Sequence, residues 1–278
     1  MGLFDRIFGR NASAPDKPAA PGAPVRREPS NTIRIANLQG IGCREDQEDS
    51  FGIANAADVT EMSRRGLFAV VADGMGGMED GKMASELAVE NFLELFRSMP
   101  EDAEISQYLM EGTHAVSQHI FNQCAGRSGT TLVAVHILGD ALNWISVGDS
   151  AIFLGRNGGV FQVNREHTCL NDLYLDALEE EIIDRARAEE DPDGRRLTAF
   201  LGMDELKMID RSQQPLHLLP GDRLLLCSDG ISGILTPPEL LEAMAVEPEE
   251  GCRLLETFVA EKALPQQDNY TVIMIAYK

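Results

Sequence analysis

The 278-residue sequence is poor in cysteine and contains no long apolar segment. Its five cysteines are scattered without a Cys-x-x-Cys pair, which indicates a reducing compartment and gives no support to a zinc site. No segment approaches the roughly 20 apolar residues of a membrane span, and the N-terminus lacks the apolar core of a signal peptide. These absences predict a cytoplasmic protein.

Positive charge is also scarce in this sequence. There are 24 Lys and Arg against 45 Asp and Glu, and the formal net charge is −21. Such a chain repels nucleic acid and anionic lipid, so we expect no nucleic acid partner. It attracts divalent cations and basic segments of other proteins. Apolar residues make up 44% of the chain, which is enough for one large domain or two small ones.

The first 31 residues have the composition of a flexible tail. Residues 11–31 are rich in Pro, Ala and Gly and predict an extended linker. Residues 1–10 predict a short amphipathic helix that docks on a partner or a membrane surface, although so short a segment also fits a frayed tail. Its apolar face would consist of Leu3, Phe4, Ile7 and Phe8. We therefore expect the folded domain to span residues 32–278.

Within that domain, apolar periodicity predicts an α+β fold. Alternating or continuous apolar runs predict strands at 32–40, 50–58, 66–73, 130–138, 141–149, 151–156, 159–164, 222–229 and 270–277. A period near 3.6 predicts helices at 80–99, 105–124, 170–190, 237–246 and 249–263. Short turns between the middle strands indicate an antiparallel meander. Runs of strands and pairs of helices are typical of antiparallel sheets covered by helices.

Carboxylates recur where these predicted strands begin or end. The positions are Asp73, Asp149, Asp229, Asp268 and the pair Glu48 and Asp49. Each aspartate alone fits a turn cap. Several buried carboxylates that converge would repel one another, and bound cations would relieve that repulsion. Oxygen ligands without clustered His or Cys favour hard ions such as Mg²⁺ or Mn²⁺.

Arg44 and a glycine-rich turn accompany these carboxylates. Arg44 precedes Glu48 and Asp49 by a few residues, and a guanidinium beside a metal cluster is suited to holding a phosphate with two hydrogen bonds. Alternatively, Arg44 is a surface residue paired with nearby acids. The segment "VVADGMGG", residues 70–77, would let backbone carbonyl groups reach a metal ion.

Six ordered motifs carry a resemblance to a known family. They are "REDQEDS", "VVADGMGG", "SGTTLVAV", "SVGDSA", "LLCSDGISGIL" and "DNYTVIMI". Together they resemble the metal-dependent PPM protein phosphatases of bacterial type, which are PP2C-like, from about Ile33 to Tyr277. The resemblance implies a sandwich of two antiparallel β-sheets flanked by pairs of α-helices.

The resemblance also assigns roles to individual residues. It implies that two Mn²⁺ or Mg²⁺ ions are bound by Asp73, the carbonyl group of Gly74, Asp229 and Asp268. Glu48 or Asp49 would hold water on the second ion, and Asp49 is a candidate for both metal binding and catalysis. Asp149 would join a third, weaker metal site. Arg44 would bind the phosphate.

The sequence departs from the family pattern at a few positions. Met75 stands where animal members have a histidine proposed as general acid, Ala151 replaces a usual arginine, and Gln47 replaces a usual asparagine. None of these changes removes a metal ligand. Residues 169–195 match the family's flap, whose acidity here suits a basic substrate segment or a solvated helical face. His167 borders this flap and is the strongest candidate among the five histidines, but each of them is predicted to be a structural or surface residue rather than a catalyst.

These observations predict a metal-dependent phosphoprotein phosphatase. It would hydrolyse phosphoserine and phosphothreonine by in-line attack of a hydroxide that bridges two metal ions. Its substrates would be proteins phosphorylated by a cognate Ser/Thr kinase. Two alternatives are a non-catalytic phosphoprotein-binding pseudophosphatase and a metal-dependent hydrolase of small phosphoesters. A pseudophosphatase should have lost metal-binding aspartates, and this sequence keeps them all.

Overall fold

The computed structural model describes residues 33–76, 79–179 and 191–278. The predicted linker and the predicted docking helix over residues 1–10 lie outside the described residues, as do residues 180–190 of the predicted flap. The predicted boundary at residue 32 therefore stays a prediction. In the described part of the chain, no helix is long and apolar enough to cross a membrane.

One sheet of the domain has its strands in the order β1, β12, β11, β7 and β8. All neighbouring strands in it are antiparallel. The strands span Ile33–Gly40 (β1), Tyr270–Tyr277 (β12), Arg223–Cys227 (β11), Ala151–Arg156 (β7) and Gly159–Gln162 (β8). The inner strand β12 is buried on both faces, which explains why its sequence is almost continuously apolar.

The second sheet has the order β10, β6, β5, β3 and β2, and is also antiparallel. These strands span Leu216–His217 (β10), Ala141–Val147 (β6), Leu132–Leu138 (β5), Leu67–Met75 (β3) and Asp49–Ala54 (β2). Two short strands extend it, since β4 (Gly129–Thr130) pairs with β3 and β9 (Asp210–Arg211) pairs with β6.

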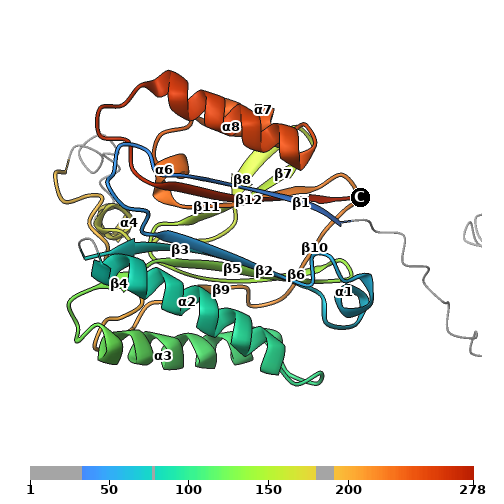
Figure 1. The fold of residues 1–278 in the computed structure, drawn as a ribbon, viewed down its shortest axis with the longest axis horizontal. Coiled ribbons are helices and arrows are strands. Elements are labelled where there is room, and N and C mark those ends of the chain that lie inside the picture. The colour runs from blue at the N-terminus through green and yellow to red at the C-terminus, as the bar shows by residue number, and fades with distance from the viewer. Residues whose placement is uncertain (1–32, 77–78, 180–190) are drawn as a thin grey trace, which may run out of the picture. The chain divides into compact units, whose positions relative to one another are not determined.

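Helices cover the outer face of each sheet (Figure 1). The pair α2 (Glu79–Ser98) and α3 (Ile105–Gln123) lies on the second sheet, and α7 (Pro237–Met244) and α8 (Pro248–Lys262) lie on the first. Shorter helices are α1 (Val59–Arg65), α4 (Cys169–Glu179) and α6 (Asp229–Ser232). The predicted layers, helix pair, sheet, sheet and helix pair, are confirmed.

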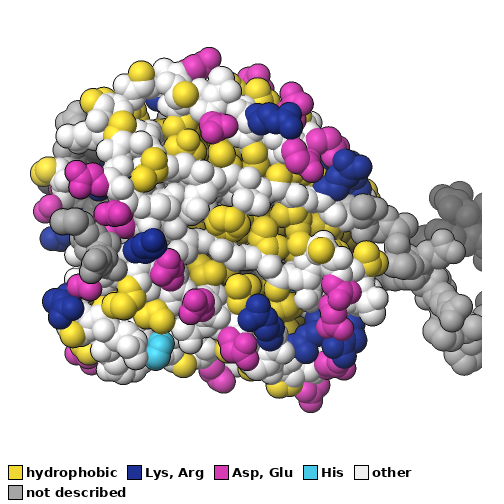
Figure 2. Space-filling view, viewed as in Figure 1, with side chains coloured by type: hydrophobic (Ala, Val, Ile, Leu, Met, Phe, Trp, Pro, Cys, Tyr) yellow, Lys and Arg dark blue, Asp and Glu magenta, His cyan; other side chains and the backbone are white. Residues whose placement is uncertain are grey.

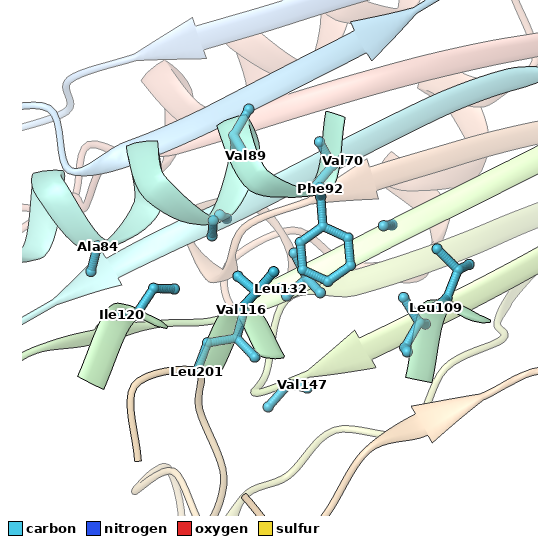
Figure 3. Packing of buried hydrophobic residues seen from close by; sticks show 14 of the residues in the cluster. Val70, Ala84, Val89, Phe92, Leu109, Val116, Ile120, Leu132, Val147 and Leu201 are labelled. Atoms are coloured by element: carbon cyan, nitrogen blue, oxygen red, sulfur yellow. The ribbon is translucent and has the colours of Figure 1, made fainter. Parts of the chain in front are cut away.

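The core forms three apolar layers, and the alternation of side chains along β3 shows why. Phe68, Val70 and Ala72 point toward α2 and α3, while Leu67, Ala69 and Val71 point between the two sheets. Figure 3 shows the first of these layers, with Val70, Phe92, Leu109 and Val116 among its labelled side chains. A third layer lies between the first sheet and the helices α7 and α8. Both sheets are therefore anchored on both faces.

Charged side chains follow the same layering. In the view of Figure 2, apolar side chains are visible in a band between two layers that carry most of the charged groups. All five cysteines are free, and three of them, Cys124, Cys227 and Cys252, are buried. The cysteines thus contribute to packing rather than to cross-links.

One predicted strand needs correction, and one helix was missed beside it. The strand predicted over residues 50–58 ends at Ala54, because Asn55 adopts a positive φ of 65° and the chain turns there. The helix α1 that follows was not predicted. Asp58 caps it by accepting hydrogen bonds from the amides of Thr60 and Glu61.

Candidate active site

The predicted site residues converge at the end of the sandwich where α4 and α6 lie (Figure 1). A pocket of about 480 Å³ opens there. Its lining includes most of the predicted set, namely Arg44, Glu48, Asp73, Gly74, Asp149, Asp229 and Asp268. Residues separated by up to 224 positions along the chain thus line one cavity.

Each carboxylate reaches the pocket through the end of a strand. Asp73 lies near the end of β3, directly opposite Asp49 at the start of β2. Asp149 follows β6, and both belong to the second sheet. Asp229 follows β11 and begins α6, and Asp268 precedes β12, so these two come from the first sheet. The pocket therefore lies where the two sheets meet.

Crowding perturbs these carboxyl groups. Burial, with a smaller contribution from the charge of Asp229, raises the pKa of Asp149 to about 7. Burial is also the main reason why the pKa of Asp73 lies well above its ordinary value, with the charges of Asp49 and Asp229 adding to the effect. The pKa of Asp229 and the pKa of Glu48 are raised chiefly by burial as well. The fully ionised cluster is therefore unfavourable without a compensating cation.

Several oxygen atoms in this cluster have no hydrogen-bond partner among the described residues. They are Glu48 Oε1, Asp49 Oδ1 and Asp229 Oδ1, and all three are shielded from solvent. Buried oxygen atoms normally have partners, so their absence at three carboxylates in one place indicates a missing positive group. Carboxylate oxygens are the ligands that Mn²⁺ and Mg²⁺ prefer. The donor set fits the predicted ions.

The side chains are nevertheless not arranged around an ion. Among the described residues, no three His, Cys, Asp or Glu side chains are placed so that they could hold a metal as they stand. One reason is that Asp268 is engaged elsewhere. Its Oδ2 accepts a hydrogen bond of 2.6 Å from Arg44 Nη2, and its Oδ1 accepts one from the amide of Asn269.

Arg44 thus lies in the pocket but is paired with a predicted metal ligand. Its side chain is 55% exposed, and so a phosphate could reach the guanidinium. The pairing with Asp268 is the kind of surface ion pair that the sequence left open as the alternative, and it is found at the predicted phosphate site itself. The role of Arg44 in phosphate binding stays a prediction.

Asp49 lies behind the pocket wall rather than in it. The residue is only 4% exposed and does not line the pocket of the other carboxylates, but borders a separate pocket with Gln39 and Ser50. Its Oδ2 accepts a hydrogen bond of 2.7 Å from Ser228 Oγ, which in turn accepts one from the amide of Thr271. Burial raises the pKa of Asp49 to about 6 even though the Ser228 hydroxyl opposes the rise.

The glycine-rich turn has a packing reason in addition to any ligand. A Cβ atom on Gly74 would lie 2.2 Å from the carbonyl oxygen of Gly81 and 2.8 Å from that of Glu48. Gly76 has a φ of 126°, which residues with a side chain rarely adopt. Close approach of α2 to β3 thus requires glycine here, and Gly77 lies outside the described residues.

Polar residues that the sequence did not single out hold the predicted ones in place. The Thr131 hydroxyl accepts a hydrogen bond from the amide of Asp73, and the Thr130 hydroxyl donates one to its carbonyl group. Asn269 is buried, accepts from the amide of Glu48 and donates to the carbonyl groups of Ile41 and Asp46. Thr130 and Thr131 belong to the motif "SGTTLVAV" and Asn269 to "DNYTVIMI", so their place within these motifs was the available signal.

The departures from the family pattern leave the carboxylates in place. Met75 lines the pocket and has no proton to donate. Ala151 is fully buried against the first sheet and its helices, where a long charged side chain would not fit. Gln47 donates a hydrogen bond to the carbonyl group of Gly40. The last two changes therefore concern the support of the site.

The predicted flap begins and ends beside the pocket, and Leu197, just after it, lines the pocket wall. α4 begins at Cys169, one residue before the predicted helix, and none of its residues is buried. The returning segment meets the flap's entry through a bridge between Thr168 and Leu197, and Leu197 lines the pocket. The base of the flap is thus fixed beside the carboxylates.

Comparisons with known proteins agree with this geometry. A family model described as protein phosphatase 2C matches residues 47–266. The serine/threonine protein phosphatase PstP of Mycobacterium tuberculosis is 26% identical over 247 residues, covering 87% of this chain, and the chain spans only 45% of the length of that relative. The serine/threonine phosphatase stp of Listeria innocua is 25% identical over 240 residues, covering 84% of this chain and 90% of its own length.

Solved structures extend the match to the fold. The crystal structure of M. tuberculosis PstP superposes with a TM-score of 0.71 at 25% identity, covering 88% of this chain and 98% of that one. PppA, a regulatory component of the Pseudomonas aeruginosa type VI secretion system, gives a TM-score of 0.70 at 26% identity with the same coverage. The PstP catalytic domain has also been solved with two manganese ions. The chain belongs to the protein phosphatase 2C family, a family of metal-dependent phosphoprotein phosphatases, as the resemblance predicted.

Proposed function

We propose that this chain hydrolyses phosphoserine and phosphothreonine in proteins in a metal-dependent reaction. The observation that carries the proposal is the convergence of carboxylates with raised pKa values and unpartnered oxygens on a pocket that also holds Arg44. Raised pKa values and unsatisfied polar atoms in a cleft are typical of functional sites. The relatives named serine/threonine phosphatases support the choice of substrate.

The donor atoms present suggest how the ions would be held. Asp73, the carbonyl group of Gly74, Asp229 and Asp268 would bind two Mn²⁺ or Mg²⁺ ions, and Glu48 and Asp49 would act through water. Asp149 would contribute to a third, weaker site. When bound, the ions supply a water molecule of lowered pKa as nucleophile and offset the charge of the phosphate.

The chain's own residues orient the substrate and handle protons. Arg44 is placed to exchange its hydrogen bond with Asp268 for two hydrogen bonds to phosphate oxygens. Asp49 has one oxygen without a partner and a pKa raised to about 6, so it can accept a proton near neutral pH. The described residues that line the pocket include no Cys, Ser or His, so we expect no phosphoenzyme.

The proposed partners follow from the same chemistry. We expect the substrates to be proteins that a cognate Ser/Thr kinase phosphorylates. We expect the reaction to take place in the cytoplasm. The net charge of −21 favours substrates with basic segments. Docking through residues 1–10 stays a prediction. The two alternatives are less favoured, because every predicted carboxylate is present and the relatives are named as protein phosphatases.

A substrate comparison tests the proposal. The full chain with Mn²⁺ should hydrolyse a phosphothreonine peptide with a much higher kcat/KM than a phosphotyrosine peptide of the same sequence or a nucleoside monophosphate, and EDTA should stop the reaction reversibly. Preferential turnover of the nucleotide would instead support a small-phosphoester hydrolase. Binding of the phosphopeptide without turnover would support a pseudophosphatase.

A further inference from the structure

His167 lies between the flap and the loop that carries Asp149. The residue is only 6% exposed. Its ring atom Nδ1 accepts a hydrogen bond of 3.1 Å from the amide of Gly148, and its own amide donates one of 2.8 Å to the carbonyl group of Gly148. Ring and backbone together therefore hold both polar groups of the residue that precedes Asp149.

The same residue also holds the base of the flap. The carbonyl group of His167 accepts a hydrogen bond of 2.9 Å from the amide of Thr198, and the amide of Cys169 donates one of 2.9 Å to the carbonyl group of Arg196. Between these bonds, Thr168 bridges to Leu197. Since both Leu197 and Asp149 line the pocket, His167 joins two of its walls.

Gly148 depends on such external bonds for its orientation. Its φ is 98°, and a Cβ atom there would lie 2.8 Å from Thr131, so no larger residue fits. Beyond Asp149, the Ser150 hydroxyl is bonded to the Thr131 hydroxyl at 2.7 Å, and the Ser150 carbonyl group accepts a hydrogen bond from Asn164. Both neighbours of Asp149 are thus fixed by hydrogen bonds, Gly148 by His167 and Ser150 by Thr131 and Asn164.

The hydrogen bond requires one particular form of the imidazole ring. Nδ1 can accept only when it carries no proton, so the ring must be neutral with its proton on Nε2. Burial lowers the pKa of His167, although the facing carboxylates Asp210 and Asp172 oppose this and Arg165 adds to it. The lowered pKa agrees with a neutral ring.

We propose that His167 is a positioning residue, whose ring and backbone amide hold Gly148, the residue before Asp149, and whose carbonyl group ties it to Thr198 at the flap base. This inference rests on the proposed function, because Asp149 is a metal ligand only if the chain is a metal-dependent phosphatase. The geometry itself can be tested without metal or substrate.

The first test uses the unaltered full chain, free of metal. Nitrogen NMR of labelled histidine at pH 7.5 should show Nδ1 of His167 unprotonated and Nε2 protonated. The Gly148 amide should exchange slowly with deuterium because it is bonded. A proton on Nδ1, or fast exchange of Gly148 in a folded chain, would overturn the proposal whether or not the protein is a phosphatase.

Paired variants separate positioning from general stability. His167→Asn places an oxygen where Nδ1 lies and keeps the acceptor, whereas His167→Leu removes it. We expect His167→Leu to speed Gly148 exchange about 3- to 10-fold and to raise the half-saturating Mn²⁺ concentration by a similar factor, corresponding to one lost hydrogen bond. His167→Asn should stay within about twofold of the wild type in both measurements.

The control is His136→Leu, which alters another buried histidine away from the pocket. His136 lies in β5 with 1% exposure, and its Nε2 is bonded to the carbonyl group of Arg65. This variant should lower the urea midpoint without changing the Mn²⁺ requirement. If it raises the Mn²⁺ requirement as much as His167→Leu does, or if His167→Asn behaves like His167→Leu, the positioning role is wrong. A wild-type protein without any phosphatase activity would contradict the proposed function but leave the Gly148 result standing.

Discussion

Two aspartates lie just beyond the two ends of β11, and their surroundings differ sharply. Asp222, before the strand, is 2% exposed and accepts hydrogen bonds from Arg156 Nε at 2.9 Å and Nη2 at 2.5 Å. The amide of Leu219 donates a third hydrogen bond to it. Asp229, after the strand, has an oxygen without a partner, and burial raises its pKa with help from the charge of Asp268. The charge of Asp222 is thus balanced by Arg156, whereas one oxygen of Asp229 has no partner among the described residues.

This contrast shows how a structural carboxylate differs from one reserved for function. A buried aspartate that stabilises a fold has its cation and its donors within the chain. An aspartate that binds a ligand has carboxylate oxygens without a partner inside the chain, and this lowers the stability of the fold. The position of the residue at a strand end is the same in both cases, so only the partners distinguish them.

Exchanging each aspartate for asparagine should produce opposite effects, and this is the largest difference that we predict. Asp229→Asn should abolish hydrolysis of p-nitrophenyl phosphate in Mn²⁺ and leave the urea midpoint of the metal-free chain unchanged or slightly higher, because a repulsive charge is lost. Asp222→Asn should keep most of the activity but lose about 3 kcal/mol of unfolding free energy, because Arg156 loses its charged partner. Near wild-type activity of Asp229→Asn would refute the metal assignment.

Arg44 should behave differently from Arg156, although both pair with an aspartate. Arg44→Ala removes a contact to the phosphate that is worth about 1.5–3 kcal/mol, so kcat/KM should fall roughly 10- to 100-fold. Lysine should restore only part of the loss, since it cannot donate in the two-pronged geometry of arginine. Steady-state kinetics measures both variants, and calorimetry with Mn²⁺ provides the control for metal binding. An unchanged kcat/KM for Arg44→Ala would leave it a surface partner of Asp268.

The unneutralised end should also make the metal-free protein sensitive to pH. Burial raises the pKa of Asp49 to about 6 and the pKa of Asp149 to about 7, from 3.8. Between pH 3.8 and these raised pKa values, the folded state holds more protons than the unfolded state. The free energy of unfolding should therefore fall on the order of a few kcal/mol as the pH rises from about 4 to 7. Urea unfolding in EDTA measures this effect.

Saturating Mn²⁺ is the matched condition for that experiment. Because a cation stabilises the ionised carboxylates, it should flatten or reverse the fall. A metal-free protein whose stability rises steadily over this pH range would show that the cluster is already neutralised within the chain.

The smallest effect should come from Ser228, which links the two sheets behind the site. Ser228→Ala removes a hydrogen bond to the Asp49 carboxylate, so the pKa of Asp49 should rise further and kcat should fall about 3- to 10-fold. Ser232→Ala, one helical turn later, is the control because the Ser232 hydroxyl makes a long hydrogen bond of 3.5 Å to the carbonyl group of Ser228 rather than to the Asp49 carboxylate. Equal losses in both variants would argue against a specific role for the Ser228 hydroxyl.

The fold and most of the pocket residues could be predicted from the sequence, because both depend on where the apolar strands end. Apolar runs that stop at Asp73, Asp149 and Asp229 placed those residues at one edge, and the antiparallel layers brought the edges together. The pairing of Arg44 with Asp268 could not be predicted from the sequence. The two residues are 224 positions apart, and only the folded structure determines which acid lies beside Arg44.

The position of Asp49 shows a second limit of the sequence. Glu48 and Asp49 are adjacent, but successive side chains of a strand point to opposite faces, so only one of them can face a given cavity. Which one faces the pocket depends on register, and β2 is set with Asp49 directly opposite Asp73. The start of α1 was different, because Asp58 followed by Glu61 already carried a helix-capping signal that the strand prediction overrode.

The order of strands in the first sheet has a consequence for how the protein is made in the cell. β12 is the last described strand to be synthesised, yet it lies between β1 and β11 and is preceded directly by Asp268 and Asn269. While the ribosome still holds residues 268–277, β1 has no neighbour and Arg44 has no Asp268 to meet. A nascent chain therefore exposes unpaired strand edges until its translation passes β12. Asp268 can join the other carboxylates around the pocket only once β12 has paired with its neighbours.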